Sequence, residues 1–372
     1  MEKEVLILTN TLFSGGAEKQ SVLLAKNLAK YFPTTLVVYY GDKIDPKLRD
    51  IVLNNKINVT YLKGNHVKKI IQLLRRINRG NVTIMISYLA TTNLLNAILG
   101  FFTGVKYRIG GIRSSRLGSV KMYIQRFLHN KLFIHTICNN YEALDFIKRY
   151  GFDLSKASVI HNCIELSEPV RYNVEKKNTI TILTVGRFVP AKDLKTALTA
   201  FSLLIQSIKE QSIKEQSIKE QSIIVRFEIV GYGEQEDYLR ELIKRLNLDE
   251  IVSVVINPLN IRDYYQNADI YLSTSLFEGL SNSIMEAMEF SLPVVATNVG
   301  DNRYLVIDGE TGFLVPTQDP DSIATALETL INSAELRKDF GVKGYKQLVE
   351  NFSEEKFIVK YLELINTLGN DK

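Results

Sequence analysis

Cysteine is nearly absent from this chain of 372 residues, which contains only Cys138 and Cys163. The two are far apart and have no Cys-x-x-Cys or Cys/His ligand spacing. Neither a disulfide framework nor a structural zinc site is therefore indicated. We interpret both as small buried hydrophobic residues.

Long apolar runs are also absent. No stretch reaches the roughly 18 apolar residues that a membrane-spanning helix needs, and the charged residues 1–4 precede an apolar run that is too short for a signal peptide. We therefore expect a cytoplasmic protein. The apolar and charged fractions, 45% and 23%, are typical of globular chains, and 372 residues exceed one ordinary core. Two domains are expected.

Acidic residues are scarce in the first half of the chain. Residues 1–170 contain 24 Lys and Arg but 11 Asp and Glu, whereas residues 171–372 contain 22 and 30. A basic half suits an anionic substrate or an anionic membrane surface, and the amphipathic segment 68–77 carries cations suited to lipid. The same segment also fits an ordinary helix covering a sheet. Nucleic acid is not expected, because no recognition motif accompanies the charge.

Short apolar runs alternate with amphipathic helical patterns in both halves. Strands apolar on both faces and separated by helices indicate a parallel sheet covered on both sides. We predict an α/β protein with two Rossmann-like domains facing a cleft, and ligands at the carboxyl ends of the strands. The predicted strands are 5–9, 35–40, 59–62, 82–87, 107–110 and 134–138 in the first half, and 180–185, 225–230, 252–256, 270–273 and 294–297 in the second.

A pentapeptide repeat, Gln-Ser-Ile-Lys-Glu, interrupts this pattern at residues 206–222. A step of five residues rotates each Ile by about 140° around a helix, so the three Ile side chains cannot share one face. We predict that the repeat extends the helix 194–205 as a mostly solvated protrusion; a loose loop insert is the alternative. No function is assigned to it.

Candidate phosphate ligands follow the first strand of the second half. Arg187 can fork onto two phosphate oxygens and Lys192 can add a point charge at the next helix; two solvated surface cations are the alternative. After the next strand, Gly231 and Gly233 permit close backbone approach, but the segment lacks the third glycine of a dinucleotide fingerprint. A tight turn is the alternative interpretation there.

Two carboxylates, Glu278 and Glu286, stand eight positions apart around a predicted helix start that follows the strand 270–273. Strand, glycine turn and helix bring a strand end and unpaired helix amides to one place, which suits a phosphorylated ligand. Ser283 and Glu286 also fit a capping box. Glu278 has no evident local partner in the sequence, and its carboxylate can accept from sugar hydroxyls.

The chain resembles the retaining glycosyltransferases of family four, which have the two-domain GT-B fold. The resemblance covers nearly the whole length and rests on six segments: Ser14-Gly15-Gly16-Ala17-Glu18, Val185-Gly186-Arg187 with Lys192, Gly231-Tyr232-Gly233-Glu234, Asn267-Ala268-Asp269, residues 278–286, and Thr311-Gly312-Phe313-Leu314-Val315. It implies an acceptor-binding domain at 1–168, a nucleotide-sugar-binding domain at 169–352, and a crossover helix within 353–372 that returns to the first domain.

The resemblance also implies roles for individual residues. Arg187 and Lys192 would bind the donor diphosphate, Glu278 the transferred sugar, and Glu286 the ribose. Backbone amides would come from Gly279, Leu280 and Ser281. Gly231 and Gly233 would also bind the donor, as would Gly15 and Gly16, which would form the first-domain loop close to the phosphate and the acceptor. Glu18 would contact the acceptor or a phosphate there.

Two positions depart from the family pattern. Ser281 stands where relatives commonly have Pro, a change that Ser tolerates as a helix cap. Arg113 stands near where many relatives have a histidine. Arginine cannot act as a general base, but Arg113 could pair with a phosphate or an anionic acceptor. None of the four histidines (His66, His129, His135 and His161) is expected to be catalytic.

The resulting hypothesis is a metal-independent, cofactor-free retaining glycosyltransferase. Its donor would be a nucleotide-diphosphate sugar, with UDP the expected nucleotide, and its acceptor a glycan or lipid diphosphate in bacterial capsule or lipopolysaccharide synthesis. The protein would work in the cytoplasm, in contact with the inner face of the membrane. The alternatives are a nucleotide-sugar epimerase and a non-catalytic membrane-surface module.

Overall fold

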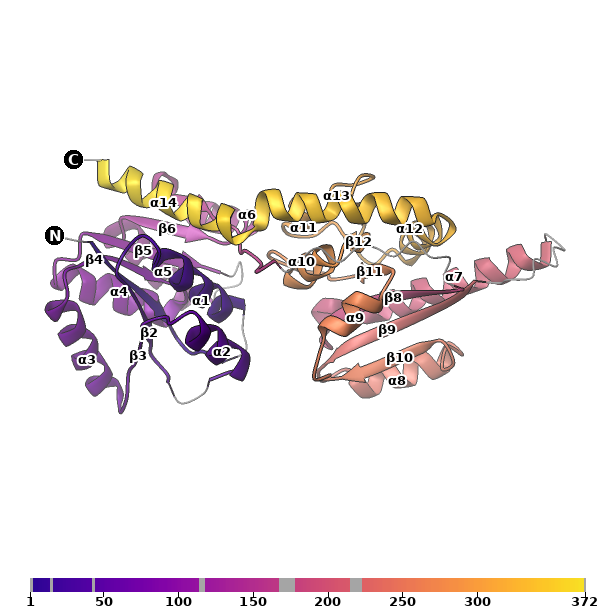
Figure 1. The fold of residues 1–372 in the computed structure, drawn as a ribbon, viewed down its shortest axis with the longest axis horizontal. Coiled ribbons are helices and arrows are strands. Elements are labelled where there is room, and N and C mark those ends of the chain that lie inside the picture. The colour runs from indigo at the N-terminus through magenta and orange to yellow at the C-terminus, as the bar shows by residue number, and fades with distance from the viewer. Residues whose placement is uncertain are drawn as a thin grey trace. The chain divides into compact units, whose positions relative to one another are not determined.

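The computed structural model describes residues 3–13, 16–41, 44–113, 118–166, 178–214 and 223–370. The chain divides into two compact units (Figure 1). Unit 1 comprises Met1–Cys163 and Glu354–Lys372, and unit 2 comprises Ile164–Ser353. Gly15 and the end of the repeat, 215–222, lie outside the described residues. Among the described residues, no helix combines the length and apolar character needed to cross a membrane.

Unit 1 is built on a parallel sheet of seven strands in the order β3-β2-β1-β4-β5-β6-β7. Six of these strands lie where the apolar runs predicted them. The apolar pattern does not reveal β7, a three-residue edge strand with a serine at its centre. The strands are β1 (Glu4–Thr9), β2 (Thr34–Val38), β3 (Val59–Tyr61), β4 (Val82–Ser87), β5 (Tyr107–Ile112), β6 (His135–Cys138) and β7 (Ala157–Val159).

Helices cover both faces of this sheet. On one face the last helix of the chain packs against α1, and both bury apolar residues in the same core. On the other face α3 buries Leu73 and Ile77 against β1, β2 and β4. The apolar face of the basic segment 68–77 is thus occupied by the sheet. The helices of unit 1 are α1 (Gly16–Leu28), α2 (Pro46–Asn54), α3 (His66–Arg79), α4 (Ala90–Phe102), α5 (Ser119–Lys131), α6 (Tyr141–Arg149) and α14 (Glu354–Asn370), with the short 3-10 helix η1 (Leu154–Lys156).

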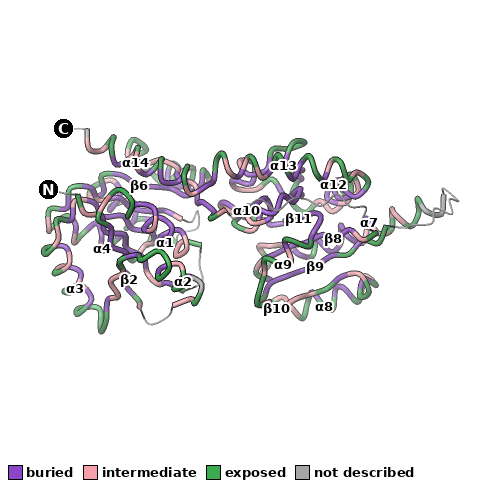
Figure 2. Tube along the Cα trace, viewed as in Figure 1, coloured by how far each residue is buried: buried purple, intermediate pink, exposed green. Residues whose placement is uncertain are grey.

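Unit 2 repeats the architecture with six parallel strands in the order β10-β9-β8-β11-β12-β13. The five predicted strands are present, and β13 adds an edge strand that the apolar pattern missed. Strand β11 in the middle of the sheet is buried throughout, whereas the edge strand β10 is mostly half-buried or exposed (Figure 2). The strands of unit 2 are β8 (Thr179–Arg187), β9 (Ile224–Tyr232), β10 (Val252–Ile256), β11 (Ile270–Ser273), β12 (Val294–Thr297) and β13 (Gly312–Val315).

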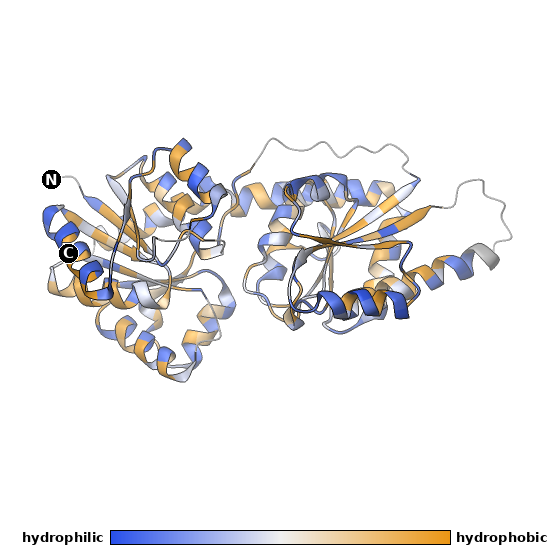
Figure 3. Ribbon diagram, turned by 90° about the horizontal axis from the view of Figure 1, so that it is seen from below, coloured by the Kyte–Doolittle hydropathy of each residue, from blue (hydrophilic) through white to orange (hydrophobic). Residues whose placement is uncertain are grey.

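The helices of unit 2 alternate hydrophilic and hydrophobic segments, as amphipathic covers of a sheet do (Figure 3). They are α7 (Leu194–Lys214), α8 (Glu236–Arg245), α9 (Arg262–Asn267), α10 (Asn282–Glu289), α11 (Asn302–Leu305), α12 (Pro320–Asn332) and α13 (Ala334–Phe352), with η2 (Pro190–Lys192) after β8. The repeat continues α7 as a helix as far as Lys214. The start of the repeat is partly held in place, because Ser207 of the first unit and Gln211 of the second both donate to the Glu328 carboxylate of α12.

Each sheet has one position where the strand order reverses. In unit 2 this point lies between β8 and β11. The strand that follows β8 in the sequence, β9, pairs with one edge of β8, and β11 pairs with the other edge. Loops leaving the carboxyl ends of such strands diverge to opposite faces, and the crevice between them is the usual ligand site of an open α/β sheet. In unit 1 the corresponding point lies between β1 and β4.

Candidate active site

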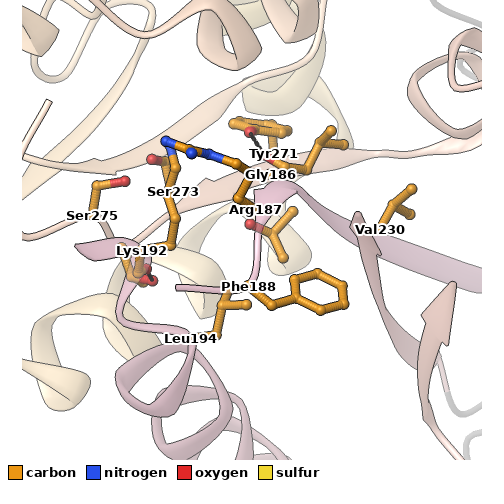
Figure 4. Close-up of a pocket in the computed structure, with 12 residues that line it drawn as sticks. Gly186, Arg187, Phe188, Lys192, Leu194, Val230, Tyr271, Ser273 and Ser275 are labelled. Carbon is orange, nitrogen blue, oxygen red and sulfur yellow. Dashed lines mark hydrogen bonds between the residues drawn. The ribbon is translucent and has the colours of Figure 1, made fainter. Parts of the chain in front are cut away.

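The loop after β8 places two cations at the edge of one small pocket. Arg187 is the last residue of β8, and Lys192 ends η2 immediately before α7. Both line a pocket at the carboxyl ends of β8 and β11, together with Ser273 and Ser275 (Figure 4). Arg187 is exposed and forms no ion pair with the described residues. The predicted cation pair is therefore assembled at the strand ends.

The backbone of this loop is fixed by the loop after β11. The Thr274 hydroxyl lies 3.0 Å from the carbonyl oxygens of both Lys192 and Asp193, and the Leu276 amide donates to the Ala191 carbonyl at 2.8 Å. Asp193 turns the chain into α7 with a φ of 45°. A left-handed aspartate is tolerated because its short side chain bonds locally, here to the Thr196 hydroxyl at 2.7 Å. Lys192 is thus held on a braced turn.

The Glu278 carboxylate contacts Lys192 of this turn. The Glu278 side chain, 15% exposed, forms an ion pair with Lys192 and accepts a hydrogen bond from the Ser275 hydroxyl at 3.0 Å. The interpretation that Glu278 lacks a local partner is wrong, because Ser275 stands three residues before it. A carboxylate held by two donors at a strand end can still accept from ligand hydroxyls through its other oxygen.

A glycine turn that sequence analysis did not single out lies against the Glu278 segment. Gly300 has a φ of 52°, and a Cβ there would stand 1.9 Å from the Glu278 carbonyl oxygen. The next residue, Asp301, donates its amide to the Gly279 carbonyl at 2.8 Å. The loop after β12 therefore supports the backbone of Glu278 and Gly279. The only sequence signal for this role is the position of Gly300, three residues after the predicted strand 294–297.

Gly231 and Gly233 lie where the end of β9 passes very close to the backbone at the end of β8. Both have positive φ, 156° and 152°. A Cβ on Gly231 would meet the Gly186 carbonyl oxygen at 1.8 Å, and one on Gly233 would meet the Phe188 carbonyl oxygen at 2.5 Å. The predicted close approach is thus to the β8 loop, so these glycines shape the loop that carries Arg187 and Lys192.

Helix α10 begins just beyond Glu278. Ser281 is its N-cap residue, and the Ser281 hydroxyl pairs with the Ser283 hydroxyl at 3.2 Å. The predicted capping box of Ser283 and Glu286 is wrong, because the helix starts two residues earlier and Glu286 lies in its second turn. The first amides of α10 have no partner within the helix, and Leu280 is buried beside them.

The Glu286 carboxylate accepts a hydrogen bond from the Tyr265 hydroxyl of α9 at 2.9 Å. Tyr265 is fully buried, and this burial, reinforced by the Glu286 charge, raises the pKa of Tyr265 well above its ordinary value. The phenol therefore stays protonated and donates at neutral pH. The Tyr265 hydroxyl thus fixes the position of the Glu286 carboxylate, and the residue as a whole is half-buried.

The predicted residues of unit 1 lie at the carboxyl ends of its own strands or on α1. Arg113 follows β5, donates to the Asn162 amide oxygen at 2.9 Å, and stacks 4.0 Å from the centre of the Tyr88 ring. Gly16 is the first residue of α1, and Glu18 in its first turn accepts from the Thr11 hydroxyl at 3.2 Å. Gly15 lies outside the described residues.

The buried histidines serve the fold. His129 is bonded on both ring nitrogens, to the Thr136 hydroxyl and the Asp153 carbonyl, each at 2.8 Å. His135 bonds the Ser158 hydroxyl at 2.8 Å. On α3, His66 Nδ1 lies 2.7 Å from the Tyr39 hydroxyl.

Sequence comparison identifies the fold that carries this site. Residues 170–347 match the family model of the glycosyl transferases group 1. This match lies within unit 2, and curated relatives over a longer part of the chain are glycosyltransferases as well. A Campylobacter jejuni enzyme named as an undecaprenol-linked alpha-1,4-N-acetyl-D-galactosaminyltransferase is 22% identical over 99% of both chains. The capsular polysaccharide biosynthesis glycosyltransferase CapM of Staphylococcus aureus is 24% identical, over 87% of this chain and 84% of CapM.

Solved structures agree on the architecture. HepE of Anabaena, solved in complex with UDP, superimposes with a TM-score of 0.80 at 17% identity, over 98% of this chain and 100% of HepE. The chain therefore has the GT-B fold, as predicted. The relatives are glycosyltransferases, several of them from surface-polysaccharide pathways, so the comparisons support the transferase prediction and not the epimerase alternative.

Proposed function

We propose that this glycosyltransferase moves a sugar from a UDP-sugar to a glycan or lipid-diphosphate acceptor, with retention of the anomeric configuration and without a metal ion. One observation carries the proposal. Lys192 and Glu278 are joined beside Arg187 at the carboxyl ends of β8 and β11, where the strand order reverses. Two cations and a carboxylate there match a ligand that has a diphosphate at one end and hydroxyls at the other.

In this proposal Arg187 and Lys192 bind the diphosphate and neutralise the charge that develops as it leaves. The first amides of α10, with those of Gly279, Leu280 and Ser281, add partial positive charge at the same place. Glu278 accepts from hydroxyls of the transferred sugar, and Glu286, held by Tyr265, accepts from the ribose. Gly231 and Gly233 act indirectly, by shaping the β8 loop.

Retention follows if the acceptor oxygen attacks the anomeric carbon on the face from which the diphosphate departs. The bond from the anomeric carbon to the phosphate oxygen breaks, the bond to the acceptor oxygen forms, and the acceptor proton passes to the departing diphosphate. Glu278 is not cast as the nucleophile, because its charge is already shared with Lys192 and Ser275.

Relatives indicate the donor and acceptor. HepE was solved with UDP and with UDP-glucose, and the Campylobacter jejuni relative is named for an undecaprenol-diphosphate glycan. We extend these to the chain as a UDP-sugar and a lipid-linked acceptor. Residues 1–168 are proposed as the acceptor-binding domain, with Arg113 and Glu18 contacting the acceptor or a phosphate and Gly15 and Gly16 contacting the donor. Residues 169–352 are proposed as the donor-binding domain. The protein would work in the cytoplasm, at the inner face of the membrane.

Mass spectrometry of the protein incubated with a panel of nucleotide sugars, with and without lipid-diphosphate acceptors, tests this proposal. We expect UDP-sugar consumption that depends on the acceptor, and its loss in Arg187→Ala and Glu278→Ala variants that melt like the wild type. Consumption of a donor in either variant at the wild-type rate would contradict the assigned site. A product with inverted configuration, or activity that requires an added divalent ion, would contradict the mechanism.

A further inference from the structure

Helices α4 and α5 of unit 1 expose an unusual number of large apolar side chains. Phe102 at the end of α4 is 80% exposed, and Val120 and Phe127 of α5 are 74% and 58% exposed. We call this set the α4–α5 patch. It comprises Leu94, Ile98, Phe101 and Phe102 of α4 and Val120, Tyr123, Ile124 and Phe127 of α5.

The two helices present these residues on one side of the unit. Strands β4, β5 and β6 are parallel neighbours, and α4 and α5 are the two crossovers that join them. Right-handed crossovers in the same direction place both helices on one face of a sheet. They are also bonded to each other, because Asn93 donates to the Gln125 amide oxygen at 2.7 Å.

The patch residues lie on a different side of each helix from the residues that cover the sheet. In α4 the exposed positions 94, 98, 101 and 102 form one helical stripe, and in α5 the positions 120, 123, 124 and 127 form another. The opposite side of α4 buries Asn93, Asn96 and Gly100, and that of α5 buries Met122, Gln125 and His129. The side that covers the sheet is therefore separate from the patch in both helices. Exposed apolar stripes on two neighbouring helices are typical of an interaction site.

The charged residues of the sequence segment that contains the patch have a single sign. Residues 51–141 contain 14 Lys and Arg and no Asp or Glu. Two cations contact rings of the patch: the Arg126 guanidinium lies 5.2 Å from the centre of the Tyr123 ring, and the Arg108 guanidinium lies 5.8 Å from that of Phe101. Lys121 and Lys131 of α5 are exposed as well. A partner that covers this surface must accept positive charge at its edge and apolar groups at its centre.

We propose that the α4–α5 patch docks unit 1 on an anionic lipid bilayer. Aromatic side chains next to cations match the membrane interface, where rings sit at headgroup depth and Lys and Arg meet lipid phosphates. Insertion of apolar side chains and attraction between opposite charges together anchor a protein stably, whereas either one alone gives weak binding. The proposal rests on the proposed function, since it names the surface that brings the enzyme to a lipid-linked acceptor. The α4–α5 patch takes the place of the basic segment 68–77 as the proposed membrane contact, because the sheet already covers the apolar face of that segment.

Flotation of the full-length protein with vesicles tests the patch. Wild type is expected to float with phosphatidylcholine vesicles that contain phosphatidylglycerol at low salt, and to float less with phosphatidylcholine alone or at raised salt. The double variant Phe101→Ser/Phe102→Ser should lower the vesicle partition coefficient about tenfold or more. Lys121→Gln/Arg126→Gln should lower it by a similar factor at low salt only.

Matched controls come from unit 2, where Leu259 is 99% and Val342 54% exposed. Leu259→Ser and Val342→Ser should float like the wild type. Failure of the wild type to float with anionic vesicles, or wild-type flotation of both patch variants, would overturn the proposal. Light scattering that shows a dimer broken by Phe101→Ser/Phe102→Ser, without vesicle binding, would make the patch a subunit interface and also overturn it.

Donor turnover with a water-soluble acceptor, measured without vesicles, separates this inference from the proposed function. The patch variants should retain wild-type turnover there. Absent turnover in a wild type that still floats would count against the proposed function alone.

Discussion

Lys192 and Glu278 lie 86 residues apart in the sequence, yet their side chains form an ion pair where β8 and β11 end side by side. The pair joins the loop that carries the two cations to the loop that opens α10. Its partners keep 24% and 15% of their side-chain surface exposed, so a ligand can reach both. The pair thus links the two halves of the proposed donor site before any donor arrives.

Lys192→Met should remove catalysis while leaving the fold intact. Methionine keeps the length of the side chain but not its charge, so the departing diphosphate loses one stabilising contact. We expect kcat/KM for the donor to fall by about 10²-fold or more. The free energy of unfolding should fall by only ~1–2 kcal/mol, because solvent still reaches Glu278. Steady-state kinetics and urea titration measure the two effects.

Lys343→Met is the matched control, since Lys343 forms an exposed ion pair with Asp339 at 2.7 Å on α13. Such a pair contributes under ~1 kcal/mol, and the variant should retain wild-type activity. Equal kinetics in Lys192→Met and the control would remove Lys192 from the site.

Gly300→Ala should disturb the Glu278 segment from behind. The added Cβ would overlap the Glu278 carbonyl oxygen, and alanine at a φ of 52° adds backbone strain. We expect a loss of ~2–4 kcal/mol in the free energy of unfolding, together with weaker UDP binding by calorimetry.

The control is Gly309→Ala, because Gly309 has a φ of 73° but no atom within 4 Å of an added Cβ. It should show the cost of the backbone conformation alone, ~1 kcal/mol, with UDP binding unchanged. If Gly300→Ala bound UDP as well as this control, the loop after β12 would not position Glu278.

Local patterns in the sequence were sufficient for most of the fold. Runs such as Val252–Ile256 and Ile270–Ser273 are apolar at all positions but one, and both were predicted with their observed bounds. The missed strands are edge strands, where a single neighbour reduces the need for apolar residues on both faces. β7 contains Ser158 at its centre, and β13 begins with Gly312, where a Cβ would stand 2.1 Å from the Val294 carbonyl oxygen.

The candidate site was predictable as a set of residues, but its contacts were not. Which cation meets Glu278 depends on the adjacency of β8 and β11, a long-range pairing that no local pattern encodes. The partner of Glu286 is Tyr265, which lies on a different helix. The capping-box error arose because Ser281 and Ser283 are equally good N-cap residues by sequence, and only the structure shows where α10 starts.

Acid should destabilise unit 1 at a histidine that is unrelated to the site. Burial lowers the pKa of His135 to about 4, from an ordinary value of 6.5. The unfolded chain therefore binds a proton at a higher pH than the folded protein does. Stability contributed by the neutral ring is complete above pH 6.5 and is lost as the pH falls from there toward 4, by ~2–3 kcal/mol.

Urea titrations of the wild type and His135→Gln between pH 7 and pH 4.5 measure this effect. Glutamine can still bond the Ser158 hydroxyl and does not titrate, so the pH dependence should be shallower in the variant. Parallel curves for the two proteins would assign the acid sensitivity to other groups, among them His129, whose pKa burial also lowers.

Helix α14 should be necessary for unit 1, although it follows all of unit 2 in the sequence. Tyr361 is fully buried in the core that α1 lines, and its hydroxyl lies 3.3 Å from that of Tyr88. Glu354 at the start of the helix accepts from Lys26 at 3.1 Å and from Asn27 at 2.6 Å. Tyr361→Ala should therefore cost ~3–5 kcal/mol of stability, as measured by urea titration.

The control for this change lies on the same helix, where Val359 is 46% exposed. Val359→Ala should cost under ~0.5 kcal/mol, because it leaves no cavity and alanine favours helix. Hydrogen exchange can locate the loss in Tyr361→Ala, which should appear first in the amides of α1 and β1. Exchange confined to α14 itself would show that the helix covers a core that is stable without it, and the fold of unit 1 would not depend on its return.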